Sequence, residues 1–404
     1  MFFNNKFSGI NFQDKKITFA TVKMEKDLPL IQTITVKEID GNPVESGRLL
    51  NKSKVSMVLR SFLEEKNSSK QVHLAIPTQH TLVRKITSLP DLEEAELGKI
   101  LQFQLGDSIL LPFDNPIYDF VKIGTIASVR NAQHAQELTM DELSNSIEDD
   151  LKGARSEILF FATSRELSED LVDVCEESGL RPLSAEVRAL ALKRLINFVH
   201  SKWLTETEMI VEVSEESIDL HIFKDELIAF SRTMPVNSNQ YFHQLQTAAT
   251  TEEIEESLSL IKDEEPPLTL LEEEEIENPL YLKEEKKIAA RVLPQSKKNT
   301  GNESVFEQEA YLNDLVNEVE KAQNFFRYTL GERQTEFTRI IVTGEYTDLI
   351  FNSFSDQMAT EVCRIDFEPI LDPSFIQRNL LDTCSVALGL AMRGREKANK
   401  RRKF

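Results

Sequence analysis

Cysteine, histidine and acidic side chains are the groups in this chain that could bind a metal or carry out catalysis. The three cysteines, Cys175, Cys363 and Cys384, are far apart and form no Cys-x-x-Cys pair, and the six histidines are scattered. Zinc sites and disulfide frameworks need such residues at close, regular spacings. The pattern therefore argues against both and predicts three ordinary buried thiols.

Acidic side chains are numerous, but they are concentrated in two segments. The formal net charge is −21, of which residues 251–285 contribute −12 and residues 131–150 contribute −6. High charge with few hydrophobic residues is typical of segments that do not fold by themselves. We therefore expect a flexible insertion at 124–155 and an acidic, disordered insertion at 245–303. No calcium-loop pattern and no Ser-His-Asp or Cys-His set accompanies these acids, so we nominate no catalytic residue.

Two stretches of alternating apolar residues lie near the start and the middle of the chain. Residues 8–37 predict three strands, the first two joined by the short turn Asp14-Lys15-Lys16. Residues 209–235 predict three more strands with equally short turns. A recurring unit of this kind indicates an internal duplication. With 404 residues the chain is long enough for two halves with separate cores.

Helices and further strands are predicted from the apolar spacing of the remaining segments. Strands are expected at 72–76, 81–87, 117–123, 158–162, 183–187 and 339–343, a turn at Leu89-Pro90-Asp91, and helices at 55–65, 93–108, 165–178, 190–198, 306–329 and 381–392.

The order of motifs along most of the chain resembles the PilM family, relatives of the cell-division protein FtsA among the actin-like ATPases. The shared pattern is a strand ending in proline, an arginine-bearing strand, a Leu-Pro turn, a Glu-Leu helix and a Pro-Phe turn. The matching residues are Ala75-Ile76-Pro77, Val83-Arg84-Lys85-Ile86, Leu89-Pro90, Glu96-Leu97, Leu110-Leu111-Pro112-Phe113 and Tyr118-Asp119-Phe120. Later matches lie at 158–162, 179–182, 191–194, 325–328, 340–344 and 387–391.

The resemblance implies an α/β protein with a duplicated actin-like ATPase fold, an additional FtsA-like subdomain and the two acidic disordered insertions. The parts expected from it are a first actin-like subdomain at 1–80, the additional subdomain at 81–182, a return helix at 183–200, a second actin-like half at 205–392 and a basic tail at 393–404.

In actin-like ATPases two hairpin turns with an Asp-x-Gly pattern cradle the phosphates of ATP, because glycine lets backbone N–H groups approach the phosphate oxygens. Asn11 and Glu212 stand here for the aspartates, Gln13 and Ser214 for the glycines, and Gly344-Glu345 for a Gly-Gly pair on the adenosine side. The nucleotide site implied by the resemblance is Gly9, Asn11, Gln13, Glu212, Ser214 and Gly344.

Each of these departures disfavours ATP with Mg²⁺. An amide is a weaker ligand for Mg²⁺ than a carboxylate, the side chains of Gln13 and Ser214 enter the space of the phosphates, and Glu345 adds negative charge. One interpretation is a degenerate ATPase, not an enzyme, whose hairpins are only structural turns. The alternative is weakened binding of ATP with Mg²⁺, Glu212 lying near the metal, or weak hydrolysis.

In PilM-like proteins a cytoplasmic N-terminal peptide of the bitopic membrane protein PilN binds in a groove between the first subdomain and the additional one. The resemblance implies an adaptor of a type IV pilus, or of related competence or secretion machinery, that links a PilN-like protein to the pilus motor ATPase complex. Arg84, Leu97 and Leu101 are expected to contact this partner. A further alternative is a membrane-tethered, FtsA-like cytoskeletal protein.

The location of the protein follows from its apolar and basic segments. No stretch approaches the ~20 apolar residues that span a bilayer, and the N-terminus does not have the pattern of a signal peptide. We expect a cytoplasmic protein, peripheral to the inner face of the cell membrane. The tail from Arg393 to Phe404 holds seven Lys or Arg residues and one acid, which suits contact with anionic lipid. Without an aromatic-rich basic face, we expect no nucleic-acid partner.

Overall fold

The structure, a computed structural model, describes residues 5–26, 28–45, 47–126, 153–236, 238, 300–372 and 375–394. The chain divides into two compact units, Met1–Asn237 with Asp314–Phe404, and Ser238–Asn313. Both predicted acidic insertions, at 124–155 and 245–303, lie largely outside the described residues, so their disorder remains a prediction.

A five-stranded sheet forms the first half of the larger unit, in the order β10-β6-β1-β2-β3. Strands β1 to β3 form the predicted antiparallel meander, and β6 and β10 extend it in parallel. The strands are β1 (Lys6–Gln13), β2 (Lys16–Glu25), β3 (Leu28–Glu38), β6 (Gln71–Ile76) and β10 (Arg181–Val187).

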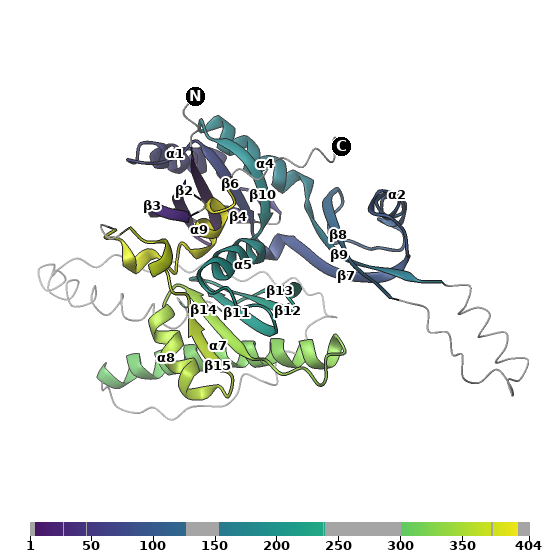
Figure 1. The fold of residues 1–404 in the computed structure, drawn as a ribbon. Helices are drawn as coiled ribbons and strands as arrows, with labels where there is room; N and C mark the ends of the chain where they lie inside the picture. The colour runs from purple at the N-terminus through teal and green to yellow at the C-terminus, as the bar shows by residue number, and fades with distance from the viewer. Residues whose placement is uncertain are drawn as a thin grey trace, which may run out of the picture. The chain divides into compact units, whose positions relative to one another are not determined.

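A second sheet repeats this arrangement in the order β13-β12-β11-β14-β15. Again three antiparallel strands come first, and two parallel strands extend the sheet beside the first of them. The strands are β11 (Thr207–Val213), β12 (Ile218–Lys224), β13 (Leu227–Met234), β14 (Arg339–Gly344) and β15 (Glu361–Arg364). The equivalence of the two sheets, strand for strand, confirms the predicted duplication (Figure 1).

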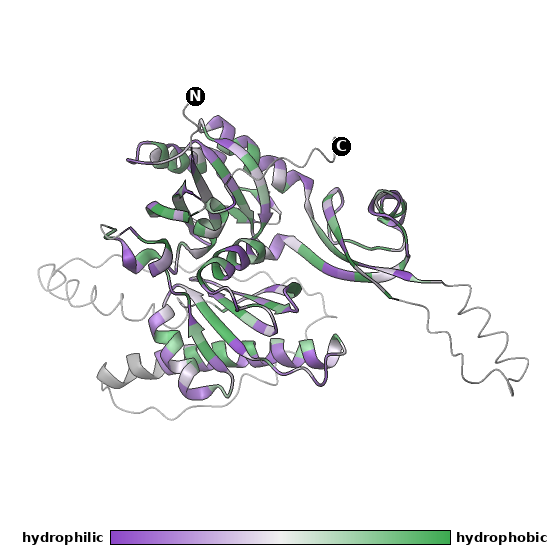
Figure 2. Cartoon of the chain, viewed as in Figure 1, coloured by the Kyte–Doolittle hydropathy of each residue, from purple (hydrophilic) through white to green (hydrophobic). Residues whose placement is uncertain are grey.

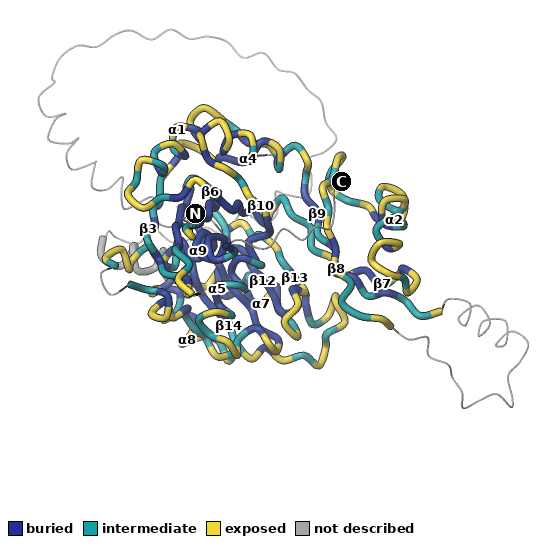
Figure 3. The backbone as a smooth tube through the Cα atoms, turned by 45° about the horizontal axis from the view of Figure 1, so that its top comes forward, coloured by how far each residue is buried: buried dark blue, intermediate teal, exposed yellow. Residues whose placement is uncertain are grey.

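Helices cover the sheets on both faces. α5 (Arg188–Val199) and α9 (Ser385–Ala391) belong to a hydrophobic core that draws residues from both sheets. α1 (Lys52–Leu63) and α4 (Arg165–Glu177) pack on the other face of the first sheet, while α8 (Thr347–Gln357) packs against β14 and β15. The strands of the two large sheets are rich in hydrophobic residues (Figure 2), and α9 is buried along its whole length whereas α5 buries about half of its residues (Figure 3).

Two glycines allow α9 to approach its neighbours closely. A Cβ atom on Gly9 of β1 would lie 2.0 Å from the carbonyl oxygen of Ala387 in α9. A Cβ atom on Gly389 of α9 would lie 2.0 Å from the carbonyl oxygen of Ala191 in α5. Neither distance is sterically allowed, so α9 is held between β1 and α5 by contacts that only glycine permits.

A smaller sheet forms the additional subdomain. It is antiparallel, in the order β7-β9-β8, and consists of β7 (Thr81–Pro90), β8 (Pro116–Ile126) and β9 (Arg155–Ser164). α2 (Glu94–Gln104) covers one face of it and buries Leu97 and Leu101 against Phe160 and other apolar residues of the strands. The spacing of apolar residues in α2 therefore reflects the packing of this subdomain.

Several predicted boundaries are wrong. Leu89 and Pro90 are not in a turn, because β7 continues through them and pairs with β9 after a shift in register. The helix expected at 93–108 ends at Gln104, and the helix expected at 381–392 is the shorter α9, preceded by a 3₁₀ turn. Elements that the sequence did not predict are α8, β15 and the two-stranded ribbon of β4 (Val44–Glu45) and β5 (Arg48–Leu49). Other elements agree within a few residues, except that α7 (Thr300–Thr329) begins earlier than expected.

Two further expectations concern the cysteines, predicted to be buried thiols, and the absence of a membrane-spanning segment. All three cysteines are free, Cys175 and Cys384 being buried and Cys363 half-buried. Among the described residues, none of the helices is both long and apolar enough to cross a membrane.

Candidate functional site

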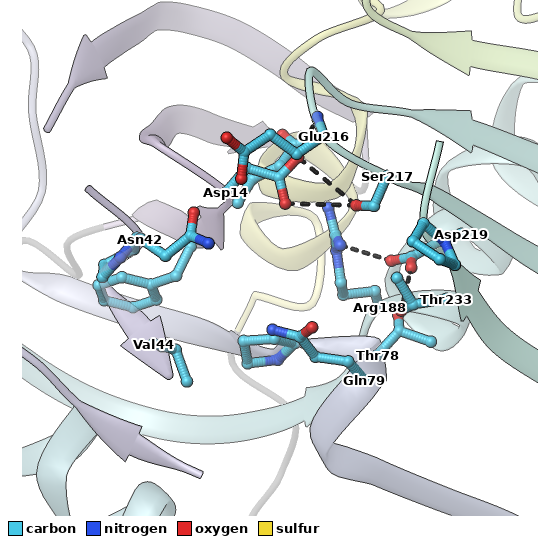
Figure 4. Close-up of a pocket in the computed structure, with 15 residues that line it drawn as sticks. Asp14, Asn42, Val44, Thr78, Gln79, Arg188, Glu216, Ser217, Asp219 and Thr233 are labelled. Carbon is cyan, nitrogen blue, oxygen red and sulfur yellow. Dashed lines mark hydrogen bonds and ion pairs between the residues drawn. The ribbon is translucent and has the colours of Figure 1, made fainter. Parts of the chain in front are cut away.

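The tips of two equivalent hairpins touch each other where the two halves of the protein meet. The turn between β1 and β2 carries Asp14, and the turn between β11 and β12 carries Glu216 and Ser217. The Asp14 carboxylate accepts the backbone N–H of Glu216 at 2.9 Å and the Ser217 hydroxyl at 3.2 Å (Figure 4). A buried backbone N–H and a hydroxyl at such a turn are the donors that would receive an anionic ligand. Here the anion is a side chain of the protein.

Ion pairs reinforce the contact between the hairpins. Lys15 pairs with Glu216 at 2.6 Å, and Lys16 pairs with Glu345 at 2.7 Å and with Glu215 at 3.4 Å. Glu345 follows β14 of the second half, so both lysines of the first turn bind acids of the second half. The Lys15 and Lys16 charges are thus matched within the protein.

Arg188, the first residue of α5, forms a buried ion cluster with the second sheet. Its guanidinium donates to Asp219 (Figure 4) and to Glu212, each at 2.5 Å, and all three side chains are at most 6% exposed. Asp219 also accepts the hydroxyl of Thr233 at 2.5 Å. Burial raises the pKa of Glu212 to about 7, although the charge of Arg188 opposes this shift. Two acids therefore share one cation in a place with little access to water.

Glu212 and Asp219 also lie close to His221, whose ring accepts or donates a hydrogen bond with Ser231 at 2.8 Å. One ligand atom from each of the three residues lies within 4.8 Å of the others, a separation that would suit a metal ion. Arg188 already supplies a positive charge between the two carboxylates, which suits a structural ion network, although Glu212 Oε2, Arg188 Nε and His221 Nε2 have no hydrogen-bond partner within the described part of the chain. Burial lowers the pKa of His221 to about 4, which keeps the ring neutral at neutral pH.

The residues predicted for a nucleotide site take other roles in this arrangement. Gly9 is packed against α9, and Gly344 lies against the backbone of Val213 with a φ of +101° that favours glycine. Ser214 closes its own turn by bonding Ser217 at 3.0 Å. The buried side-chain amides of Asn11 and Gln13 have no hydrogen-bond partner among the described residues, and one carboxylate oxygen of Glu212 also has none.

These positions do not fit ATP with Mg²⁺. The Asp14 carboxylate takes the donors of the second turn, Arg188 takes the carboxylates that would face a metal, and the Gln13 side chain stands where the family has glycine. What remains beside Arg188 is a cavity of about 290 Å³ lined by Gln13, Asp14, Asn42, Thr78, Ser217 and Thr233, among others (Figure 4).

Sequence reasoning missed the importance of Asp14, Arg188 and Asp219. One signal was present: Asp219 and His221 alternate on the strand Ile218–Lys224, whose other residues are largely apolar, so they must share one buried face. Their partner Arg188 could not be identified this way, because it follows a different strand of the other half.

A second depression lies between the first sheet and the additional subdomain. This subdomain groove has a volume of about 400 Å³, and its lining includes Ile117, Asp119, Val121, Phe161, Leu190 and Arg393. Ile117, Asp119 and Val121 come from alternate positions of β8, so they share one face of that strand. β8 and β10, which both line the groove, are terminal strands of their sheets.

The predicted partner contacts lie elsewhere. Leu97 and Leu101 are fully buried in the core of the subdomain, so their side chains cannot reach a partner. Arg84 is exposed on β7, the strand at the other edge of the small sheet from β8. None of the three lines the subdomain groove, although the groove itself lies where a partner site was expected.

Comparison with known proteins places these features in context. A sequence model of the family described as "Type IV pilus assembly protein PilM" matches residues 9–257. No curated protein matches the chain. Among solved structures, the chain is similar to the "PilM-PilN type IV pilus biogenesis complex", with 14% identity, a TM-score of 0.66 and coverage of 96% of this chain and 98% of that chain.

Two other solved structures are similar at a lower level. The ethanolamine utilization protein EutJ from Carboxydothermus hydrogenoformans has 10% identity, a TM-score of 0.46 and coverage of 96% of this chain and 90% of its own. MreB5 of Spiroplasma citri bound to ADP has 12% identity, a TM-score of 0.42 and coverage of 95% and 94%. The fold is the predicted duplicated actin-like fold. The two equivalent sheets and the similarity to the PilM-PilN complex support this assignment.

Proposed function

The chain belongs to the family of type IV pilus assembly proteins PilM, and from this premise we propose that it is a non-catalytic adaptor that captures a peptide of a membrane protein in the subdomain groove. The similar solved structure is a complex of PilM with PilN, so a PilN-like protein is the proposed partner.

The apolar lining of the subdomain groove carries this proposal. Val121 is 50% exposed and Ile117 is 36% exposed, both on the face of β8 that lines the groove. Apolar side chains that remain exposed in a concave site favour a ligand with apolar side chains of its own. An extended peptide would meet them along the strand, where alternate side chains point the same way.

The contacts between the two hairpins support the non-catalytic part of the proposal. Asp14, Lys15 and Lys16 already pair with donors and acids of the opposite hairpin, and Arg188 pairs with both buried carboxylates. Binding of ATP would have to displace these contacts, which makes the alternative, weakened nucleotide binding, energetically costly. Hydrolysis would further need a metal ligand set that is now paired with Arg188.

The place of the adaptor in the cell follows from its partner. Through a PilN-like membrane protein the chain would lie in the cytoplasm at the inner face of the membrane and connect that protein to the pilus motor. Contact of the basic tail with anionic lipid is a secondary part of the proposal. Arg393 does not belong to that contact, because its side chain is directed into the fold, towards Ser184 and Glu186.

Fluorescence anisotropy with a labelled peptide from the cytoplasmic N-terminus of the PilN-like protein encoded in the same genome tests this function. Val121→Glu places a charge in the groove and should weaken peptide binding at least about tenfold. Phe103→Glu is the matched control, since Phe103 is an 82% exposed apolar residue on α2 that does not line the groove, and it should leave binding unchanged. Equal binding by wild type and Val121→Glu would refute the groove as the peptide site.

A further inference from the structure

Arg393 is the one cationic side chain that lines the subdomain groove among the described residues. It follows α9, the last helix among the described residues, and comes to the groove from the C-terminal part of the chain. Its Nη1 donates to Ser184 Oγ at 3.0 Å and to Glu186 Oε2 at 3.1 Å, both on β10. Its side chain is 22% exposed, so it is accessible to a molecule in the groove but not freely solvated.

Glu186 is itself fixed from a second direction. Arg194 of α5 donates to both of its carboxylate oxygens, at 2.6 Å and 2.8 Å, and also to the carbonyl of Gly389 at 2.8 Å. Two arginines thus share one carboxylate that is only 7% exposed in its side chain. This three-residue cluster carries an excess of one positive charge at the floor of the groove.

His73 holds the backbone that carries Arg393. Its Nε2 lies 3.0 Å from the carbonyl oxygen of Gly394, and its Nδ1 lies 2.8 Å from Ser184 Oγ. A carbonyl can only accept, so Nε2 carries the proton and Nδ1 accepts the Ser184 hydroxyl. The Ser184 oxygen then accepts from Arg393, which gives a consistent chain of three hydrogen bonds. Burial lowers the pKa of His73 to about 4, so this neutral form persists at neutral pH.

The close packing of α9 fixes the same residue from its other side. α9 packs closely on β1 at Gly9 and on α5 at Gly389, and it is buried along its whole length. Arg393 directly follows this buried helix, so its backbone is positioned before a peptide binds, which lowers the entropic cost of binding through it.

We propose that Arg393 is a specificity-determining residue of the subdomain groove that hydrogen-bonds a carboxylate or carboxamide oxygen on a side chain of the bound peptide. This inference rests on the proposed peptide-binding function. The groove is otherwise mostly apolar, with Asp119 as an acidic group on its β8 wall, so a polar acceptor on the peptide is best satisfied at Arg393. A guanidinium offers five N–H donors in a planar fork, which suits such an oxygen.

Binding of the same labelled peptide to Arg393→Ala, Arg393→Lys and a chain ending at Gly394 tests the proposal. Arg393→Ala should bind about tenfold more weakly than wild type, and Arg393→Lys should recover part of the loss because it keeps the charge but not the fork. The chain ending at Gly394 lacks the remaining basic tail and should bind like wild type. A loss in this shortened chain as large as in Arg393→Ala would assign the effect to the tail and overturn the proposal.

An alanine scan of the peptide, measured with wild type and with Arg393→Ala, identifies the acceptor. Replacing one acidic or amide residue of the peptide should weaken its binding to wild type about tenfold. The same replacement should weaken binding to Arg393→Ala less than about twofold, as expected for two groups that interact directly. If no position shows this coupling, Arg393 has only a structural role and the proposal is wrong. If wild type does not bind the peptide at all, the proposed function itself fails, so the two failures are distinguishable.

Discussion

The carboxylate of Asp14 accepts the backbone N–H of Glu216 at 2.9 Å, although 202 residues separate the two in the chain. The contact joins the first hairpin of one half to the corresponding hairpin of the other. In an actin-like ATPase these turns would face a phosphate from both sides. In this protein the aspartate acts as the anion for the opposite turn, so the two hairpins are joined by a side chain of the protein itself.

Replacing Asp14 should expose an anion site. Asp14→Ala leaves the Glu216 N–H and the Ser217 hydroxyl without their acceptor and should lower the free energy of unfolding by about 1–3 kcal/mol. Inorganic phosphate should then raise the unfolding temperature of the variant but not that of wild type, because only the variant has free donors. Asp40→Ala, at a side chain that is 93% exposed, is the control and should behave as wild type. An equal response of all three proteins to phosphate would contradict the assignment.

Loss of the buried cation should be far more costly than loss of an exposed one. Arg188→Met leaves Glu212 and Asp219 facing each other without a counter-charge and should lower the free energy of unfolding by about 3–5 kcal/mol. Arg378 pairs with Glu368 at the surface, and Arg378→Met should cost less than about 1 kcal/mol. Urea denaturation measures both. Similar losses in the two variants would show that the Arg188 cluster is not buried as described.

The raised pKa of Glu212 predicts a specific dependence of stability on pH. Its ordinary value is 4.5 and its folded value is about 7, so the folded protein holds a proton there that the unfolded chain releases. The contribution of Glu212 to the free energy of unfolding is therefore fully present below about pH 4.5 and is lost as the pH rises through 7. Glu212→Gln removes the titration.

The comparison of wild type with Glu212→Gln isolates this contribution. The stability of wild type relative to the variant should fall as the pH rises from about 5 to about 8, measured by urea denaturation at each pH. The buried histidines His73 and His221, with pKa values lowered to about 4, act in the opposite sense in both proteins, since their stabilisation is lost as the pH falls below 6.5. A constant difference across this range would show that Glu212 does not titrate there.

Close packing of α9 predicts opposite effects of the same substitution at two glycines. Gly9→Ala would place a methyl group 2.0 Å from the carbonyl of Ala387 and should cost at least about 3 kcal/mol or prevent folding. Gly98→Ala, in the exposed helix α2, meets only the Phe120 ring at 3.6 Å and should raise stability by about 0.5–1 kcal/mol. Thermal unfolding of the two variants decides. Tolerance of Gly9→Ala would mean that α9 can move.

The sequence predicted the parts of the fold that depend on local pattern. Alternation at 8–37 and 209–235 specified two equivalent meanders, because strand pairing through a short turn is determined by neighbouring residues. Short elements such as β15 were missed because four residues give no period to detect. Leu97 and Leu101 were predicted to contact the partner. They lie instead on the apolar face of α2, which is buried in the core of the subdomain.

The site could be predicted only in part, since its contacts join distant segments. The resemblance to actin-like ATPases directed attention to Asn11, Gln13, Glu212 and Ser214 in the two hairpins, and their role in a nucleotide site stays a prediction. The pairing of Arg188 with Glu212 could not be predicted, because it depends on how the two halves come together. Arg393 was assigned to a basic tail from its neighbours in sequence. Its hydrogen bonds to β10 could not be foreseen, because they require α9 to end beside that strand.

Calorimetric titration of the nucleotide-free protein with the N-terminal peptide of its PilN-like partner tests the adaptor function most directly. We predict saturable binding with a single site per chain, and the same affinity when Mg-ATP is added. Mg-ATP alone should give no heat of binding. Peptide binding that appears only in the presence of Mg-ATP, or no binding under either condition, would contradict a nucleotide-independent adaptor.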